Sequence, residues 1–300
     1  MFSPLLRTAN TIISGKEEQT KLAIACLLAK GHLLIEDLPG MGKTTLAHLL
    51  AKLFGLNYSR IQFTSDMLPA DIIGVSVFDR NATEFQFHPG PVFSQLVLAD
   101  EINRATAKTQ SALLEAMEEQ QITTDGKTYP LNDPFFVIAT QNPQNQTGTF
   151  PLPESQLDRF LMRIVLGYPD RQTERGILSG ADRRDLLQEI KPVFSTQELI
   201  HMQQQIRNVH ISSALLDYVQ DILQFSRYNQ HFLNGLSPRA GLALLRAAQA
   251  WAFIHNREMV IPDDIKAILP AVILHRLVAR DNHNANDQHI TQLFNELAIP

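Results

Sequence analysis

Short apolar segments alternate with leucine-rich amphipathic segments through the first half of the chain. The apolar segments lie at residues 31–36, 93–98, 134–139 and 164–166. Between them, residues 44–54 and 109–119 place leucine or methionine at helical spacing. Strands that alternate with helices are typical of a parallel sheet covered by helices, so this pattern predicts an α/β fold with an αβα core.

One segment of this half predicts a hairpin. Residues Gln121–Tyr129 carry Asp125-Gly126 between threonine-rich flanks. The Asp-Gly pair favours a tight turn between paired strands, because both residues tolerate the positive φ that such a turn needs.

The second half has a helical pattern from Ser195 to Pro300. Ser237-Pro238 combines an N-cap residue with a proline at the first helical position and predicts a helix through Asn256. Pro262 opens another helix. An Asn- and Asp-rich loop over 281–288 precedes the last one, expected over 290–297.

This change of pattern predicts the domain organisation. We expect an α/β core over residues 1–170, a polar, charge-rich linker over 171–194 and a C-terminal all-helical domain over 195–300. Two domains also agree with a length of 300 residues at about 150 per domain.

Composition excludes several classes of protein. Residues 1–150 hold 11 basic against 15 acidic residues, and residues 151–300 hold 15 against 16, so neither half has the excess positive charge of a nucleic-acid binder. The single cysteine, Cys26, excludes an intrachain disulfide and a multi-thiolate zinc site. No apolar run is long enough for a membrane helix and no signal peptide is recognisable, so we expect a cytoplasmic protein without membrane insertion.

The first candidate site is a phosphate-binding loop. Gly40-Met41-Gly42-Lys43-Thr44-Thr45 follows an apolar strand and opens a helix. Glycines and a helix N-terminus direct backbone N–H groups at an anion, Lys43 would reach the β- and γ-phosphates of ATP, and Thr44 would bind Mg²⁺. Asp37 stands where the usual pattern has glycine. The candidate nucleotide-binding residues are Asp37, Leu38, Pro39, Gly40, Met41, Gly42, Lys43, Thr44 and Thr45.

A second candidate site is an acidic pair at the end of an apolar strand, Asp100-Glu101. Asp100 would hold Mg²⁺ and Glu101 would polarise the attacking water. The simpler alternative is a strand that ends in solvated acids. The ten histidines show no spacing typical of a metal site, and no Gly-x-Ser-x-Gly nucleophile motif occurs.

Several longer strings of the chain are more specific than the phosphate-binding loop. They include Arg60-Ile61-Gln62-Phe63-Thr64, Leu68-Pro69-Ala70-Asp71, Gly90-Pro91-Val92-Phe93, Asp100-Glu101-Ile102-Asn103-Arg104-Ala105, Lys108–Glu119, Ala139-Thr140-Gln141-Asn142-Pro143, Leu152-Pro153-Glu154 and Gln156-Leu157-Asp158-Arg159-Phe160. On these strings the chain resembles the MoxR family of AAA+ ATPases, from about Gly15 to Arg276. The resemblance implies that the helical domain is a lid and that an acid at position 37 is tolerated.

The resemblance also implies roles for three further residues. Asn142 would be the polar sensor that orients the attacking water, although an Asx turn before Pro143 is the alternative. Arg159 would be the arginine finger that a neighbouring subunit inserts, with Arg163 as its competitor and an intrachain ion pair as the alternative. Arg239 would be the second sensor, which contacts the γ-phosphate from the lid; otherwise it is an exposed helical arginine.

Residues 57–95 correspond in this family to a helix-2 insert, and the Asp-Gly hairpin corresponds to an insert before the sensor strand. Both inserts would face the pore or a client. Five apolar side chains of the first insert could contact a client, although ordinary packing is the simpler explanation for each: Met67, Leu68, Ile72, Ile73 and Phe78.

We therefore expect an ATPase that binds ATP and Mg²⁺ between core and lid and against the next subunit. The finger implies a ring, a hexamer, that nucleotide forms or tightens. The resemblance implies chaperone-like remodelling or maturation of a client protein, with a von Willebrand factor A domain protein as partner. Three alternatives remain open: a nucleic-acid motor, which the charge balance disfavours; a small-molecule kinase, which the arginines disfavour; and a nucleotide-gated scaffold with little turnover, which Glu101 disfavours.

Overall fold

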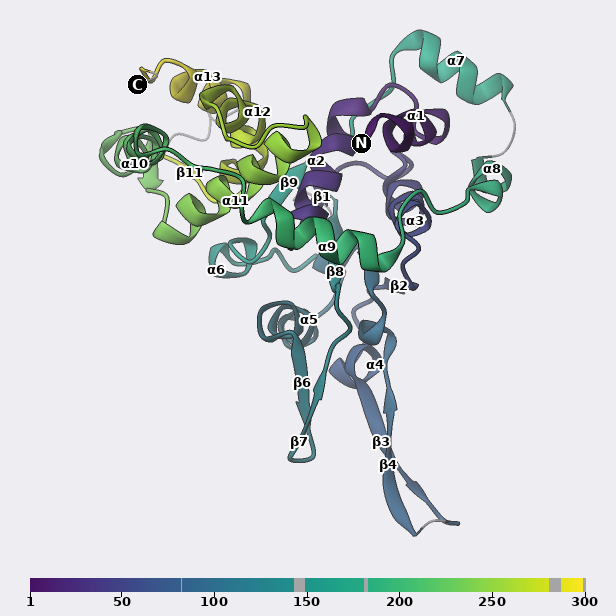
Figure 1. Cartoon of the computed structure of the whole chain (residues 1–300). Helices are drawn as coiled ribbons and strands as arrows, with labels where there is room; N and C mark the ends of the chain where they lie inside the picture. The colour runs from purple at the N-terminus through teal and green to yellow at the C-terminus, as the bar shows by residue number, and fades with distance from the viewer. Residues whose placement is uncertain (82, 143–148, 181–182, 281–286, 299–300) are drawn as a thin grey trace.

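A five-stranded parallel sheet forms the centre of the first half of the chain (Figure 1). The computed structural model describes residues 1–81, 83–142, 149–180, 183–280 and 287–298. In the order in which they lie side by side, the strands are β2 (Tyr58–Gln62), β5 (Leu96–Asp100), β8 (Phe136–Gln141), β1 (Leu33–Glu36) and β9 (Met162–Ile164). The predicted α/β core is therefore confirmed.

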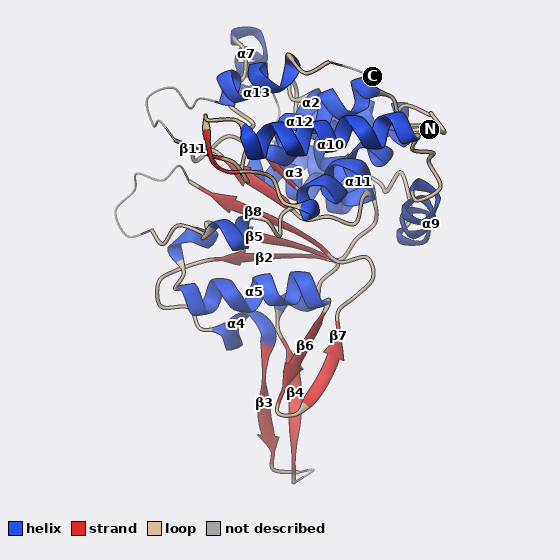
Figure 2. Ribbon diagram, turned by 90° about the vertical axis from the view of Figure 1, so that its left-hand side faces the viewer, coloured by secondary structure: helices blue, strands red, loops and turns tan. Residues whose placement is uncertain are grey.

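Successive residues of the strands enter two separate hydrophobic cores, one on each face of the sheet. In β5, Leu98 joins the core on one face and Ala99 joins the core on the other. Figure 2 shows α5 (Ala107–Glu119) on one side of the sheet. The opposite face is covered by α1 (Ser3–Ile12), α2 (Glu17–Leu28) and α3 (Lys43–Leu53). Burial on both faces explains why these strands are apolar throughout rather than alternating.

Two hairpins project from the core side by side (Figure 1). The hairpin predicted from Asp125-Gly126 is confirmed, with both residues at positive φ. The other hairpin follows the short helix α4 (Pro69–Ile73), and no Asn-Gly or Asp-Gly pair marks its turn in the sequence. The first hairpin along the chain is β3 (Gly74–Asp79) and β4 (Glu84–Pro89), and the second is β6 (Gln121–Thr124) and β7 (Lys127–Pro130).

An aromatic stack joins the two hairpins near their bases. The rings of Phe87 in β4 and Tyr129 in β7 have centroids 4.2 Å apart and planes inclined by 22°. The base of the first hairpin is closed by two glycines, because a Cβ atom on Gly74 would lie 2.6 Å from the backbone nitrogen of Gly90. The hairpins are thus fixed where they leave the core.

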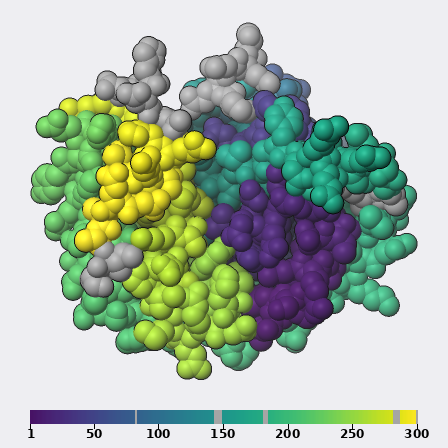
Figure 3. Space-filling model, turned by 90° about the horizontal axis from the view of Figure 1, so that it is seen from above, coloured from purple at the N-terminus to yellow at the C-terminus, as the bar shows by residue number. Residues whose placement is uncertain are grey.

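The helices of the second half pack directly on the first half. They are α9 (Thr196–Ile206), α10 (Ser213–Tyr228), α11 (Pro238–Ile254), α12 (Pro262–Ile273) and α13 (Asp287–Asn295). One hydrophobic core contains residues of both halves, and Gln203 of α9 donates a hydrogen bond to the carbonyl oxygen of Leu27 in α2 at 2.9 Å. Figure 3 shows the N-terminal helices against this C-terminal group. The predicted helical lid is present.

The second half is less uniformly helical than the sequence predicts. β10 (Phe232–Asn234) and β11 (Val278–Ala279) form a small antiparallel pair. The segment expected as a linker contains α7 (Arg171–Ser179) and α8 (Arg183–Glu189). We propose that the core ends at residue 170 and that the helical domain begins at residue 195. Most of the predicted 281–288 loop lies outside the described residues. Among the described helices, none combines the length and apolar character needed to cross a membrane.

His32 supports a prediction about pH and stability. Its Nδ1 accepts a hydrogen bond from the Val137 N–H at 3.0 Å and its Nε2 lies 3.3 Å from the Met117 carbonyl oxygen, and burial lowers its pKa from 6.5 to about 4. In the unfolded chain His32 therefore becomes protonated as the pH falls below 6.5, whereas in the folded chain it stays neutral down to about pH 4. We expect the titration of His32 alone to lower the free energy of unfolding by about 3 kcal/mol as the pH falls through that range.

Urea unfolding at several pH values measures this loss. The matched His32→Asn variant removes the titrating group, and its stability should fall less steeply with decreasing pH. An NMR titration in which the His32 ring protonates near pH 6.5 in the folded protein would contradict the prediction.

Candidate functional site

The loop over residues 37–42 joins β1 to α3 and opens at the N-terminus of that helix. Gly40 and Gly42 have φ of +85° and +91°, a conformation that residues with a side chain rarely adopt. Gly42 is the N-cap of α3, and Thr44 is exposed in the first helical turn. The unpaired N–H groups and the positive end of the helix dipole make this terminus a site for an anion.

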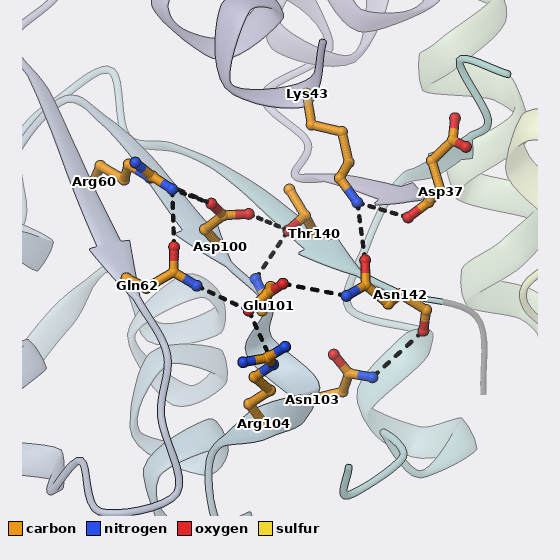
Figure 4. Close-up of polar contacts among 10 residues, drawn as sticks. All are labelled: Asp37, Lys43, Arg60, Gln62, Asp100, Glu101, Asn103, Arg104, Thr140 and Asn142. Atoms are coloured by element: carbon orange, nitrogen blue, oxygen red, sulfur yellow. Dashed lines mark hydrogen bonds and ion pairs between the residues drawn. The ribbon is translucent and has the colours of Figure 1, made fainter. Parts of the chain in front are cut away.

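The loop forms one wall of a cavity of about 370 Å³. The opposite wall consists of polar side chains at the carboxyl ends of β2, β5 and β8. Figure 4 shows these side chains pointing toward one another. The sequence-predicted residues that line the cavity are Pro39, Gly40, Gly42, Lys43, Thr44, Thr45, Asp100, Glu101 and Asn142. Leu38 and Met41 belong to the loop, and Met41 packs against the hydrophobic core.

Asp37 is buried and its side chain does not face the cavity. Its Oδ2 accepts a hydrogen bond from the N–H of Gly167 at 2.6 Å, and its Oδ1 accepts one from the N–H of Leu38 at 2.8 Å. Figure 4 shows the carboxylate directed away from Lys43, which contacts only the backbone carbonyl. The acid at the position usually held by glycine therefore ties the start of the loop to the chain after β9.

Lys43 connects the loop to the strand ends. Its Nζ donates to the carbonyl oxygen of Asp37 at 2.6 Å and to Oδ1 of Asn142 at 3.2 Å. Burial lowers the pKa of Lys43, and the nearby carboxylates of Asp100, Asp37 and Glu101 oppose that shift. The amine thus stands between the glycine loop and the acidic pair.

Asp100 is 7% exposed and both of its oxygens are occupied. Oδ1 accepts a hydrogen bond from the hydroxyl of Thr140 at 2.6 Å. Oδ2 accepts from the Arg60 guanidinium, at 2.7 Å from Nη2 and 3.2 Å from Nε. These contacts hold the carboxylate at the floor of the cavity.

Glu101 begins the loop after β5 at φ +57°, in the left-handed region. Its N–H donates to the Thr140 hydroxyl at 2.9 Å, so Thr140 bridges both acidic residues. Its Oε1 accepts from the Asn142 amide at 3.2 Å, and its Oε2 accepts from the Gln62 amide at 3.0 Å. Arg104 Nε lies 2.9 Å from the same Oε2. The carboxylate is held at the cavity by three neighbours.

This arrangement can hold a polyphosphate together with a hard divalent cation. Thr44 and Asp100 both line this cavity and carry side-chain oxygens that could act as ligands. Mg²⁺ characteristically takes one or two protein oxygens together with substrate phosphates. The described residues contain no group of three or more His, Cys, Asp or Glu side chains that could hold a metal by themselves. The donor set therefore fits a cation that arrives with a phosphate ligand.

Arg159, Arg163 and Arg239 do not line this cavity. Arg159 and Arg239 both pair with Glu118 of α5 and line a different cavity, between the core and the lid. Arg163 pairs with Glu36 at 2.6 Å and also with Asp287. The structure thus brings together the predicted loop, acidic pair and first sensor, and places the predicted arginines elsewhere.

Three residues of the site received no role from the sequence: Arg60 and Gln62, which line the cavity, and Thr140, which is buried and bonds both acidic residues. All three residues lie in sequence strings that resemble the family. The side chains that they contact, however, depend on the order of the strands in the sheet. The register that pairs Gln62 with Asp100 puts β2 beside β5 and brings Arg60 and Gln62 to the acidic pair. Recognition of residues 58–62 as a strand next to β5 would have found them.

Comparisons with known proteins agree with this geometry. Residues 32–162 match the model of the ATPase family associated with various cellular activities (AAA), and residues 224–293 match an AAA lid domain. The chain is 46% identical to the uncharacterised protein YeaC of Bacillus subtilis over 92% of this chain and 87% of that one. It is 41% identical to chaperone MoxR1 of Mycobacterium tuberculosis over 89% of this chain and 73% of that one.

A solved structure is also similar throughout. The crystal structure of a candidate ATPase from Cytophaga hutchinsonii superposes with a TM-score of 0.91 at 34% identity. The match covers 100% of this chain and 94% of that one. The relation of core to lid described above is therefore shared with an experimentally determined fold.

Thr140→Val should destabilise the fold, because it removes the hydroxyl that bridges Asp100 and the Glu101 N–H. We expect a loss of about 1–3 kcal/mol in the free energy of unfolding, measured by urea denaturation. Thr140→Ser should restore most of it. Thr128→Val, at an exposed hairpin position, is the matched control and should change stability by less than about 0.5 kcal/mol. Equal losses in both valine variants would contradict the bridging role.

Proposed function

Because the chain belongs to the MoxR family of AAA+ ATPases, we propose that it hydrolyses ATP with Mg²⁺ and uses the cycle to remodel or mature a client protein. One observation carries the proposal. Lys43, Asp100 and Glu101 lie in one cavity with Asn142, at the N-terminus of a glycine-loop helix. A helix N-terminus that follows a glycine loop, an amine and two carboxylates are the groups that phosphoryl transfer to water needs.

The loop binds the phosphates of ATP in this proposal. The N–H groups of residues 40–45 cradle the β-phosphate, and Lys43 exchanges its present acceptors for oxygens of the β- and γ-phosphates. Thr44 and Asp100 would hold Mg²⁺, whose charge offsets that of the phosphates. Arg60 already places a cation on Asp100, which orients this carboxylate.

Glu101 accepts a proton from the attacking water. The water oxygen then forms a bond to the γ-phosphorus, the bond from that phosphorus to the β-phosphate oxygen breaks, and ADP leaves with the electron pair. Asn142, whose amide already contacts Glu101 and Lys43, orients the water and the γ-phosphate. The left-handed backbone at Glu101 directs the carboxylate into the cavity rather than along the strand.

The arginines act between subunits in this proposal. Arg159 and Arg239 lie outside their own chain's phosphate cavity and line a cavity at the seam of core and lid. We assign the finger to Arg159 rather than Arg163, because Arg163 is committed to Glu36 and Asp287 with a side chain only 14% exposed. A finger that serves the next subunit requires a ring, and we propose a hexamer formed or tightened by ATP.

The hairpins supply a client surface in this proposal. Phe78 and Phe85 of the first hairpin are 47% and 68% exposed, and Leu68 is 63% exposed. Met67 and Ile73 pack against the core, and Ile72 is fully buried, so these three serve packing. The name of the M. tuberculosis relative, a chaperone, supports a protein client. A partner with a von Willebrand factor A domain is part of the same proposal.

Two site variants should separate binding from hydrolysis. Glu101→Gln keeps the size of the side chain and one acceptor oxygen but loses the base, so it should bind ATP and hydrolyse it at least about 100-fold more slowly. Lys43→Ala should lose ATP binding itself. Equilibrium titration with a fluorescent ATP analogue and phosphate release measure the two effects. Normal turnover by Glu101→Gln would show that the base lies elsewhere.

Mixed subunits test the ring. We expect wild-type specific activity to rise with protein concentration, and Arg159→Ala and Glu101→Gln each to be nearly inactive, because an arginine finger accelerates phosphoryl transfer by about 10³–10⁵-fold. An equal mixture should recover about a quarter of wild-type activity, since that fraction of subunit contacts joins an intact cavity to an intact finger.

Each alternative has its own outcome in this assay. Normal hydrolysis by Arg159→Ala at all concentrations would remove the trans finger. Complementation of Glu101→Gln by Arg163→Ala instead would move the finger to Arg163. Phosphate transfer to a metabolite would support a kinase, and tight ATP binding without turnover would support a scaffold.

A further inference from the structure

Glu118 joins two arginines that come from different parts of the chain. It lies in the last turn of α5, beside the base of the second hairpin. Its Oε2 lies 3.0 Å from Nη2 of Arg159, which follows the short helix α6 (Glu154–Leu157) of the core. Its Oε1 lies 3.3 Å from Nη1 of Arg239, in the first turn of α11 in the lid. Each oxygen of one carboxylate thus holds one guanidinium.

Glu118 lies among an excess of positively charged side chains. The cavity at this seam, about 320 Å³, is lined by the cations Lys30, Arg159, Arg239, Arg246 and Arg276. Its other lining acid, Asp158, is bound by the almost fully buried Arg276, with Nε 2.7 Å from Oδ1. Glu118 is therefore the acid of this cavity that balances the repulsion between Arg159 and Arg239.

We propose that Glu118 is a positioning residue that presents Arg159 and Arg239 together to the nucleotide of the neighbouring subunit. The inference rests on the proposed function, in which both arginines act in trans. One carboxylate between two guanidinium groups leaves a net positive charge, and each arginine keeps most of its five N–H donors for phosphate oxygens. The side chains of Arg159 and Arg239 are 28% and 49% exposed, so these donors remain accessible.

This arrangement links the core and the lid at the γ-phosphate. Because Arg159 belongs to the core and Arg239 to the lid, a ligand that binds both must find the two parts in one relative position. Glu118 fixes that position before the phosphate arrives, which reduces the ordering that binding would otherwise require. The residue contributes through the arginines and does not line the phosphate cavity of its own chain.

The test uses full-length Glu118→Gln, which removes the charge, and Glu118→Asp, which keeps the charge but shortens the reach. Glu119→Gln is the matched control, on the same helix with no ion pair among the described residues. We expect kcat for ATP hydrolysis to fall by about 10- to 100-fold in both Glu118 variants, with KM for ATP nearly unchanged and the control equal to wild type. Thermal unfolding and light scattering should show intact folding and assembly.

Mixed subunits then separate positioning from a general structural defect. A mixture of Glu118→Gln with Glu101→Gln should recover activity, because Glu101→Gln subunits carry intact arginines. A mixture of Glu118→Gln with Arg159→Ala should not recover, since both defects lie on the same side of the subunit contact.

Three results would overturn the inference. Wild-type kcat in the Glu118 variants, together with impaired and complementable Arg159→Ala and Arg239→Ala, refutes positioning by Glu118 but leaves the proposed function intact. A kcat above wild type would make Glu118 a competitor of the phosphate rather than a support. Normal hydrolysis by both arginine variants would mean that the proposed trans mechanism itself has failed.

Discussion

Buried charge at the carboxyl edge of the parallel sheet is the constraint on which the rest of the site depends. Asp100 and Lys43 are both nearly fully buried there, and burying such side chains without polar partners costs free energy. Thr140 and Arg60 satisfy Asp100, while a backbone carbonyl and Asn142 satisfy Lys43. Four of the sheet's strands must therefore keep their order and register for the network to close.

The packing of the lid explains where the arginines lie. α11 and α12 pack against α2 and β9 through one continuous hydrophobic core. β9 is the edge strand of the sheet opposite to the edge strand β2. This docking carries the first turn of α11 to the end of α5 instead of over the glycine loop. Arg239 therefore lies away from the glycine loop of its own chain, and this position supports the proposal that the arginines act between subunits.

The sequence predicted those features whose chemistry is local. Gly40, Gly42 and Lys43 mark a loop and a helix start within a few residues, and Asp125-Gly126 specifies its own turn. Partners distant in sequence could not be read in this way. The acceptor role of Asp37 toward Gly167 and the pairing of Glu118 with Arg239 depend on how separate elements pack, and no spacing encodes that. The arginines were recognised by resemblance, but their location required the lid.

For protein engineering, the stack of Phe87 on Tyr129 separates the base of each hairpin, which is held to the core, from a replaceable tip. Phe87 pairs with Ser76, two residues from Gly74 at the base of the first hairpin, and Tyr129 pairs with Ile122, which belongs to a hydrophobic core. Beyond them, Phe78 and Phe85 contact each other at the far end of the first hairpin, in an edge-to-face arrangement. Because none of the described residues between 77 and 86 contributes to the two hydrophobic cores, a different tip grafted there should change what the hairpin presents without repacking the domain beneath it.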